Sequence, residues 1–125
     1  MKGDANAMYD KIIETSLLYD FYAQLLTEKQ REVLRLYHEE NYSLSEIAES
    51  FSISRQGVFD TLKNAEKTLS EYEKKLGLVR KFENTKGTIK RANEQIDALI
   101  RSHASDKDFT AQLTEIKEII DTLGL

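Results

Sequence analysis

Apolar residues recur three or four positions apart along most of the chain, the spacing that places them on one face of an α-helix. The stretch around which the rest is organised runs from residue 43 to residue 69. It contains two apolar series, separated by Ser52-Ile53. Their members are Leu44, Ile47, Ala48 and Phe51, followed by Val58, Leu62, Ala65 and Leu69. The pattern predicts two helices joined by a tight turn, a helix-turn-helix.

Capping residues mark where the two helices begin. Ser43 and Glu46 have the spacing of a capping box, and Ser54 is placed to cap the second helix. Ile53 is expected to plug the space between the helices. The second helix of such a motif normally offers its N-terminal residues to a DNA groove. The exposed candidates on this recognition helix are Arg55, Gln56, Phe59, Asp60 and Lys63.

The N-terminal part predicts two further helices. Residues 8–26 are apolar on more than one face, so we expect this helix to pack both on its own domain and on another subunit. Thr27 and Gln30 form a second capping box, and the helix that they start ends near Glu40. Residues 1–7 lack a periodic pattern. We treat them as a candidate added tail before a native start at Met8.

The C-terminal half predicts long helices. Beyond the turn, apolar residues alternate four and three positions apart as far as Val79, which is a heptad seam. Gly77 and Gly87 lie near a phase slip in this pattern, so the long helix from Arg55 is expected to bend or break between them. A last amphipathic helix is expected to turn five residues inward. These are Phe109, Leu113, Ile116, Ile120 and Leu123.

Composition agrees with an all-α protein. The 125 residues include no proline and only five glycines, so little interrupts a helix. We divide the chain into a helix-turn-helix domain, residues 8–76, and a helical extension, residues 77–125. Cysteine is absent, which excludes disulfides and thiol chemistry. No apolar run approaches the roughly 20 residues of a membrane span and no signal peptide is visible, so we expect a cytoplasmic protein without membrane insertion.

Charge argues against a strong duplex-DNA binder. Residues 27–69 carry six basic and eight acidic side chains, a net charge of −2, whereas duplex binding relies on cations that neutralise phosphates. Between residues 74 and 91 basic side chains outnumber acidic ones, and we call the basic residues of this segment the basic stripe. Its members are Lys74, Lys75, Arg80, Lys81, Lys86, Lys90 and Arg91. The basic stripe is either a salt-sensitive contact to nucleic acid or phosphate, or a solvated helix face.

The sequence contains no residue pattern that indicates catalysis. His38 and His103 are the only histidines, and neither lies in a ligand-spaced cluster, so we predict no metal site. There is no glycine-rich phosphate loop and no set of nucleophile, base and orienting group. We therefore expect neither a cofactor nor enzymatic activity. Phe59 is open to two interpretations, an exposed aromatic contact or part of a wide core or subunit interface.

At this point the residues carry a resemblance. Segments 26–30, 43–48 and 53–55 are similar to region four of bacterial sigma factors. The chain more closely resembles the YlxM family (UPF0122), small helix-turn-helix proteins linked to the signal recognition particle, over about residues 11–82. The matching residues are Asp20-Phe21-Tyr22, Leu25-Leu26-Thr27, Lys29-Gln30, Leu36-Tyr37, Ser54-Arg55-Gln56, Val58-Phe59-Asp60, Lys63, Glu66, Leu69, Tyr72-Glu73 and Lys75-Leu76.

Three positions depart from these families. The YlxM family usually has alanine where this chain has Gly57 and tyrosine where it has Phe59. Sigma factors carry polar, DNA-reading residues where Phe59 and Asp60 stand, and a carboxylate there repels phosphate.

The resemblance implies a regulator or accessory of the signal recognition particle that binds the particle's GTPase, its RNA, or both. From the residues alone we expect a homodimer formed through the long helices, with Leu76 and Val79 at the seam. One alternative is a DNA-binding transcription regulator of the sigma-region-four type, for which DNA binding should be weak. Another is a helical protein scaffold without a nucleic-acid role.

Overall fold

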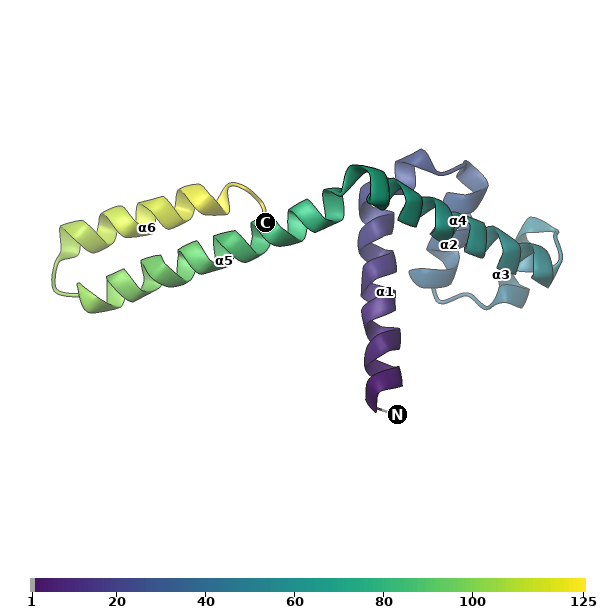
Figure 1. Ribbon diagram of the computed structural model, residues 1–125, viewed down its shortest axis with the longest axis horizontal. Helices are drawn as coiled ribbons and strands as arrows, with labels where there is room; N and C mark the ends of the chain where they lie inside the picture. The colour runs from purple at the N-terminus through teal and green to yellow at the C-terminus, as the bar shows by residue number, and fades with distance from the viewer. Residues whose placement is uncertain (1) are drawn as a thin grey trace. The chain divides into compact units, whose positions relative to one another are not determined.

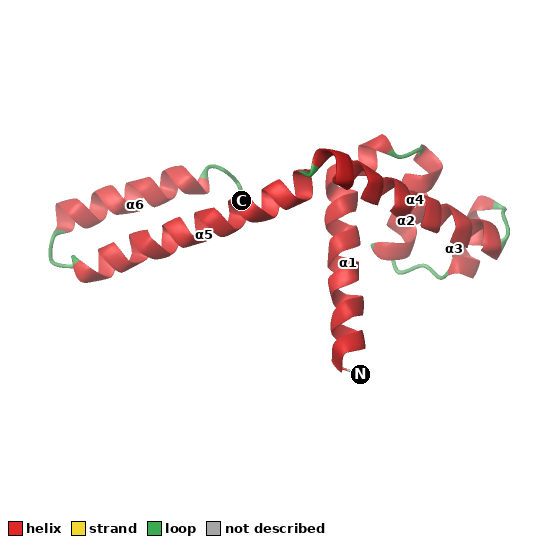
Figure 2. Ribbon diagram, viewed as in Figure 1, coloured by secondary structure: helices red, strands yellow, loops and turns green. Residues whose placement is uncertain are grey.

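The computed structural model describes residues 2–125, with side chains described from Asp10 onward, and its regular structure there is entirely helical (Figures 1 and 2). The elements are α1 (Lys2–Tyr22), the 3-10 helix η1 (Ala23–Leu25), α2 (Glu28–His38), α3 (Leu44–Phe51), α4 (Arg55–Leu76), α5 (Leu78–Ser102) and α6 (Lys107–Asp121). The all-α fold with a helix-turn-helix is thus confirmed. The chain divides into two compact units, residues 1–79 and residues 80–125, each described below by itself.

The predicted capping residues start the helices of the first unit. The N–H of Gln30 donates to Thr27 Oγ1 at 3.2 Å and the N–H of Glu46 donates to Ser43 Oγ at 3.1 Å. Both side chains at the third helical position bond back to the cap N–H, which completes the two capping boxes. Ser52 ends α3 in the left-handed region, with φ of 55°, and this reverses the chain between α3 and α4.

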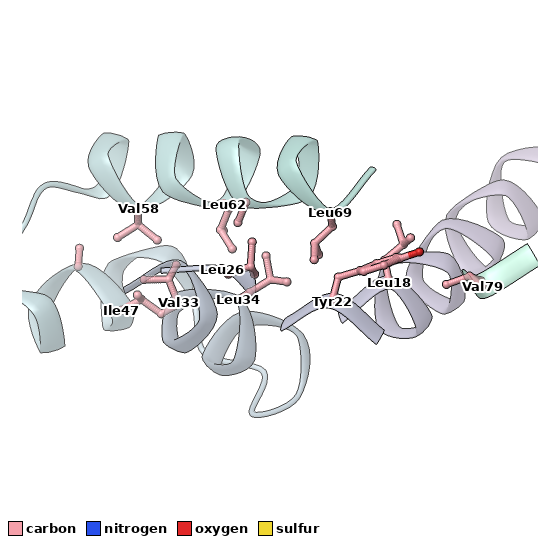
Figure 3. Close-up of a cluster of buried hydrophobic side chains, with 12 residues drawn as sticks. Leu18, Tyr22, Leu26, Val33, Leu34, Ile47, Val58, Leu62, Leu69 and Val79 are labelled. Atoms are coloured by element: carbon pink, nitrogen blue, oxygen red, sulfur yellow. The ribbon is translucent and has the colours of Figure 1, made fainter. Parts of the chain in front are cut away.

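The core of the first unit lies along one side of α4 (Figure 3). Val58 and Leu62 face α2 and α3, and Leu69 lies toward the end of the core that holds Leu18 and Tyr22. Ala48 and Ala65 are buried too, and their small side chains let the helices approach closely. The core comprises Leu18, Tyr22, Leu26, Val33, Leu34, Ile47, Ala48, Val58, Leu62, Ala65, Leu69 and Val79. The 3.6-residue pattern of the sequence therefore identified the α4 face correctly.

Helix α1 differs in its limits from the expected 8–26 helix. It begins at Lys2 and gives way to η1 after Tyr22. The side chains of Met8 and Tyr9 lie outside the described part. Further along, Leu18 is buried whereas Ile12 and Ile13 are about half exposed, at 54% and 42%. The unit's own core thus covers only part of the apolar surface of α1.

The long helix breaks at Gly77, the first residue of the interval in which a bend or break was expected, whereas Gly87 lies inside α5. Gly77 adopts a φ of 62°, a left-handed conformation that ends α4 one residue before α5 begins. Tyr22, only 1% exposed, holds this junction: its hydroxyl donates to Glu73 Oε1 at 2.6 Å and accepts from the N–H of Leu78 at 3.1 Å. The N–H of Val79 donates to the same Glu73 oxygen at 2.9 Å. These bonds satisfy two of the free N–H groups at the start of α5.

The expected position of Val79 at an intersubunit seam is wrong. Its side chain is 7% exposed and belongs to the core of the first unit. The seam was extrapolated along one continuous helix, but the left-handed turn at Gly77 rotates the residues after it. Leu76, before the break, is 54% exposed and remains on the surface.

The second unit is an antiparallel hairpin in which α5 and α6 lie side by side (Figure 1). Asp106 caps α6 by accepting from the N–H of Phe109 at 3.1 Å, and Lys117 Nζ contacts Asp97 Oδ1 at 2.7 Å across the pair. Leu113 is buried as expected. Ile116, expected inward, is instead 46% exposed, because Lys117 rather than Ile116 faces α5. Leu123, also expected inward, is 61% exposed and lies beyond the end of α6 at Asp121. Among the described residues, no helix is both long and apolar enough to cross a membrane.

Candidate functional site

The first turns of α4 form the candidate interface. Ser54 caps the helix by accepting from the N–H of Gly57 at 2.9 Å. The five residues expected on the recognition helix are all exposed and all lie within its first nine residues. They are Arg55, Gln56, Phe59, Asp60 and Lys63. The structure thus brings the predicted residues together on one outward surface, which we call the recognition surface.

Two polar side chains of the recognition surface are bonded to each other. The Gln56 amide Nε2 donates to Asp60 Oδ1 at 3.0 Å. A glutamine that reads adenine needs both ends of its amide for the base, and here the donor end is directed at a neighbouring carboxylate. The negative charge of Asp60 remains close to where a phosphate or base edge would lie. This pair therefore disfavours direct readout of duplex DNA.

Phe59 supplies apolar surface to the same region. It is 42% exposed, so it stands outside the core, and the Lys63 ammonium lies 5.4 Å from its ring centroid. With Leu44, Arg55 and Gln56 it lines a groove of about 480 Å³ at the start of α3 and α4. Aromatic and arginine side chains are enriched at the centres of protein interfaces. The groove is suited to an apolar side chain of a binding partner.

The basic stripe is fully exposed, but its parts belong to different helices. Lys74 and Lys75 lie in the last turn of α4, whereas the other five residues lie on α5. The break at Gly77 interrupts the helical register between these two groups. The four-residue step from Lys86 to Lys90 stays within α5 and keeps these two on one face.

A cleft that the sequence did not indicate lies on the first unit. It measures about 560 Å³, and its lining residues come from α1, α2, the loop after α2, and α4. These residues are Lys11, Ile12, Thr15, Tyr37, His38, Asn41, Tyr42 and Glu66. No local motif joins four separate segments, so sequence spacing could not have found it.

His38 and Glu66 face each other in this cleft. His38 Nε2 lies 3.6 Å from Glu66 Oε1, longer than a standard hydrogen bond, and Nε2 has no hydrogen-bond partner among the described residues. The contact with His38 holds the pKa of the Glu66 carboxyl below its usual value, with a smaller contribution from Lys63, whereas burial acts in the opposite direction. His38 is thus half-buried beside a carboxylate. Within residues 10–125, no cluster of three metal-ligating side chains occurs.

Comparison with known proteins gives consistent matches over both units. A family model described as "UPF0122: Putative helix-turn-helix protein, YlxM / p13 like" matches residues 9–116. A UPF0122 protein of Thermoanaerobacter sp. (strain X514) is 42% identical over 118 residues, covering 94% of this chain and all of that protein. UPF0122 proteins of Geobacillus kaustophilus and Listeria innocua are 41% and 37% identical, each match covering 90% of this chain and 99% of the relative.

Proposed function

The chain belongs to the UPF0122 family of helix-turn-helix proteins, and on that premise we propose that it is a non-enzymatic regulator or accessory of the signal recognition particle pathway. In this proposal the chain binds the particle's GTPase, its RNA, or both. The link to the particle rests on the YlxM resemblance. The observation that supports binding through the recognition surface is the exposed Phe59, which lines a groove with Leu44, Arg55 and Gln56.

The recognition surface is better matched to protein than to duplex DNA. Gln56 is engaged with Asp60, and the charge of Lys63 is partly offset by Glu66 Oε2 at 3.9 Å. Phosphate contacts dominate affinity for DNA, so a surface with few free cations binds it weakly. An exposed ring with a neighbouring arginine, by contrast, is typical of the anchors that contribute most to protein affinity.

RNA contact is the second element of the proposal. The cations of the basic stripe are exposed, and a set of lysines and arginines can bind a ribose-phosphate backbone without reading bases. Such binding weakens strongly with added salt. Salt dependence therefore distinguishes an RNA contact through the basic stripe from an apolar protein contact through Phe59.

We also propose that the protein acts as a homodimer in the cytoplasm. The half-exposed Ile12, Ile13 and Leu76 leave apolar surface on the first unit that its own core does not cover. Apolar surface left uncovered on a folded unit is available to a second copy of the chain. A DNA-binding regulator of the sigma-region-four type is the second candidate, favoured by the exposed, Ser54-capped start of α4, where such motifs contact bases.

Pull-down from native lysate tests the proposal. The untagged chain, coupled to a resin, is incubated with lysate with and without nuclease, beside a Phe59→Ala variant and a control Asn64→Ala variant, which removes an exposed side chain elsewhere on α4. We expect the particle GTPase to be retained after nuclease by the wild type and Asn64→Ala, and lost by Phe59→Ala. Loss of the particle on nuclease treatment would assign the contact to RNA. Absence of particle components in every arm would refute the proposal.

A further inference from the structure

We infer that the α5–α6 hairpin is a self-association surface whose partner is the same hairpin of a second copy of this chain. This rests on the proposed homodimer and deepens it by assigning the contact that holds the dimer together to the hairpin, rather than to the exposed apolar residues of the first unit. The starting observation is how little apolar surface the hairpin buries by itself. Within residues 80–125, all of which are described, Leu113 is the one buried side chain.

Large apolar side chains remain exposed on both helices of the hairpin. Leu99 on α5 is 41% exposed, and Ile116 and Ile119 on α6 are 46% and 62% exposed. Leu123, just after α6, is 61% exposed. A pair of helices can cover only the surface between them, so each helix needs a further neighbour to bury a second apolar stripe.

Leu99, Ile116 and Ile119 lie on the same side of the hairpin. Successive residues of an α-helix are rotated by about 100°. Leu99 precedes the half-buried Ile100, and Ile116 and Ile119 precede the half-buried Lys117 and Ile120. In each helix, the residue before an inward-facing residue points about 100° away from the neighbouring helix. Because α5 and α6 run antiparallel (Figure 1), these preceding residues lie on the same side of the hairpin in both helices.

The two broad faces of the hairpin consequently differ in character. One face, which we call the apolar hairpin face, carries Ala92, Leu99, Ile116 and Ile119, and the same rotation places the polar side chains of Thr88, Gln95 and Gln112 among them. The same rotation places polar and charged residues on the opposite face. These are Lys90, Glu94, Arg101, Thr114, Glu118 and Asp121. The hairpin is therefore amphipathic as a layer, like one half of a four-helix bundle.

Charge identifies a second copy as the partner. Lys90, Glu94 and Arg101 on α5 and Glu118 and Asp121 on α6 lie on the opposite face, and Asp97 and Lys117 pair within the hairpin. The edges of the apolar hairpin face carry Arg91 on α5 and Glu115 on α6, which have opposite charges. Two hairpins related by a two-fold axis parallel to the helices place each α6 over the α5 of the other copy. The alternative two-fold arrangement places α5 on α5, with like charges together.

The first arrangement is self-complementary. Arg91, at the outer edge of α5, and Glu115, at the outer edge of α6, are both exposed and bring opposite charges to the two rims of the apolar hairpin face. An isologous interface requires one surface to carry both complementary halves. The hairpin meets this requirement, and the product is an antiparallel four-helix bundle with α6 of one copy over α5 of the other.

The mass of the full chain in solution tests the inference. The variant Ile116→Glu/Ile119→Glu charges the apolar hairpin face, and the matched control Ala111→Glu/Thr114→Glu places the same charges elsewhere on α6. By sedimentation equilibrium at micromolar concentration, we expect the wild type and the control at twice the 14.4 kDa chain mass. The face variant should sediment as a monomer with unchanged helical circular dichroism. A monomeric wild type, or equal dissociation of both variants, would overturn the inference.

Cross-linking gives a second result that does not depend on a disruptive substitution. The chain has no cysteine, so single-cysteine variants can be mixed without competing thiols. Oxidation of Leu99→Cys mixed with Ile116→Cys should give a covalent heterodimer, and Leu99→Cys mixed with Ala111→Cys should not. Equal yields from both mixtures would contradict the geometry. The pull-down reads particle binding rather than mass, so the inference and the proposed function can fail separately.

Discussion

The Tyr22 hydroxyl should stabilise the first unit far more than its single oxygen atom suggests. Tyr22→Phe keeps the ring but removes the donor to Glu73 Oε1 and the acceptor for the N–H of Leu78. A hydrogen bond to a charged group contributes about 1.5–3 kcal/mol, and leaving a buried donor unsatisfied costs about 1–3 kcal/mol. The two losses occur at the same junction, so the two ranges are not added together. We therefore expect the free energy of unfolding to fall by about 2–3 kcal/mol.

Urea denaturation followed by circular dichroism measures this change. Tyr72→Phe is the matched control, because Tyr72 stacks on Tyr22 with ring centroids 6.0 Å apart but makes only an exposed, 3.5 Å hydrogen bond to the Leu25 carbonyl. The control should cost less than about 0.5 kcal/mol, as is usual for surface substitutions. A loss below about 0.5 kcal/mol for Tyr22→Phe, or equal losses for both variants, would refute the assigned role.

Alkaline pH provides an independent test of the same bond. Burial raises the pKa of the Tyr22 phenol above its ordinary value of 10.0, and the bond to Glu73 raises it further. Because the folded pKa is higher than the unfolded one, the stabilisation is complete below about pH 10 and is lost as the pH rises through the folded value. Tyr22→Phe should remove this part of the alkaline loss of stability. If stability falls at alkaline pH to the same extent in Tyr22→Phe as in the wild type, another group causes the loss.

Three further predictions concern the rest of the first unit. Because the pKa of Glu66 is lowered beside His38, its stabilisation is present above about pH 4.5 and is lost on further acidification, so Glu66→Gln should flatten stability curves recorded between neutral pH and pH 3. Gly57→Ala should raise the free energy of unfolding by about 0.5–1 kcal/mol in urea titrations, because glycine is less favourable than alanine within a helix. The new Cβ would lie 3.2 Å from Ser54 Oγ, which must shift slightly to accommodate it. A lower stability would mean that this shift breaks the Ser54 cap. Asp60→Asn should strengthen the weak binding to random duplex DNA in gel shifts by a few-fold, whereas nanomolar binding by the wild type at physiological salt would contradict the argument from charge.

Local signals predicted the elements of the fold. A capping box joins residues three apart, so Thr27 with Gln30 and Ser43 with Glu46 are legible without any tertiary contact. The break at Gly77 is equally local, because glycine adopts a positive φ at little cost. The recognition surface follows from the same register, since five residues near the start of one helix are positioned by that helix alone.

Extrapolation failed where it crossed the break at Gly77. The heptad seam placed Val79 at an interface, and this prediction assumed one continuous helix. The left-handed residue at Gly77 changes the phase of everything after it, so Val79 turns into the core. In α6, Lys117 rather than Ile116 lies between Leu113 and Ile120 on the side that faces α5, where it pairs with Asp97.

The sequence by itself determined an all-α protein with a helix-turn-helix, its caps and its principal break, because these depend on residues within one or two helical turns. Only the tertiary structure decided which surfaces are shared between elements. The Tyr22–Glu73 bond joins residues 51 apart, and the cleft around His38 and Glu66 is lined by four segments of the chain. Such contacts depend on how helices pack, and many different sequences of the same local pattern could pack without forming them.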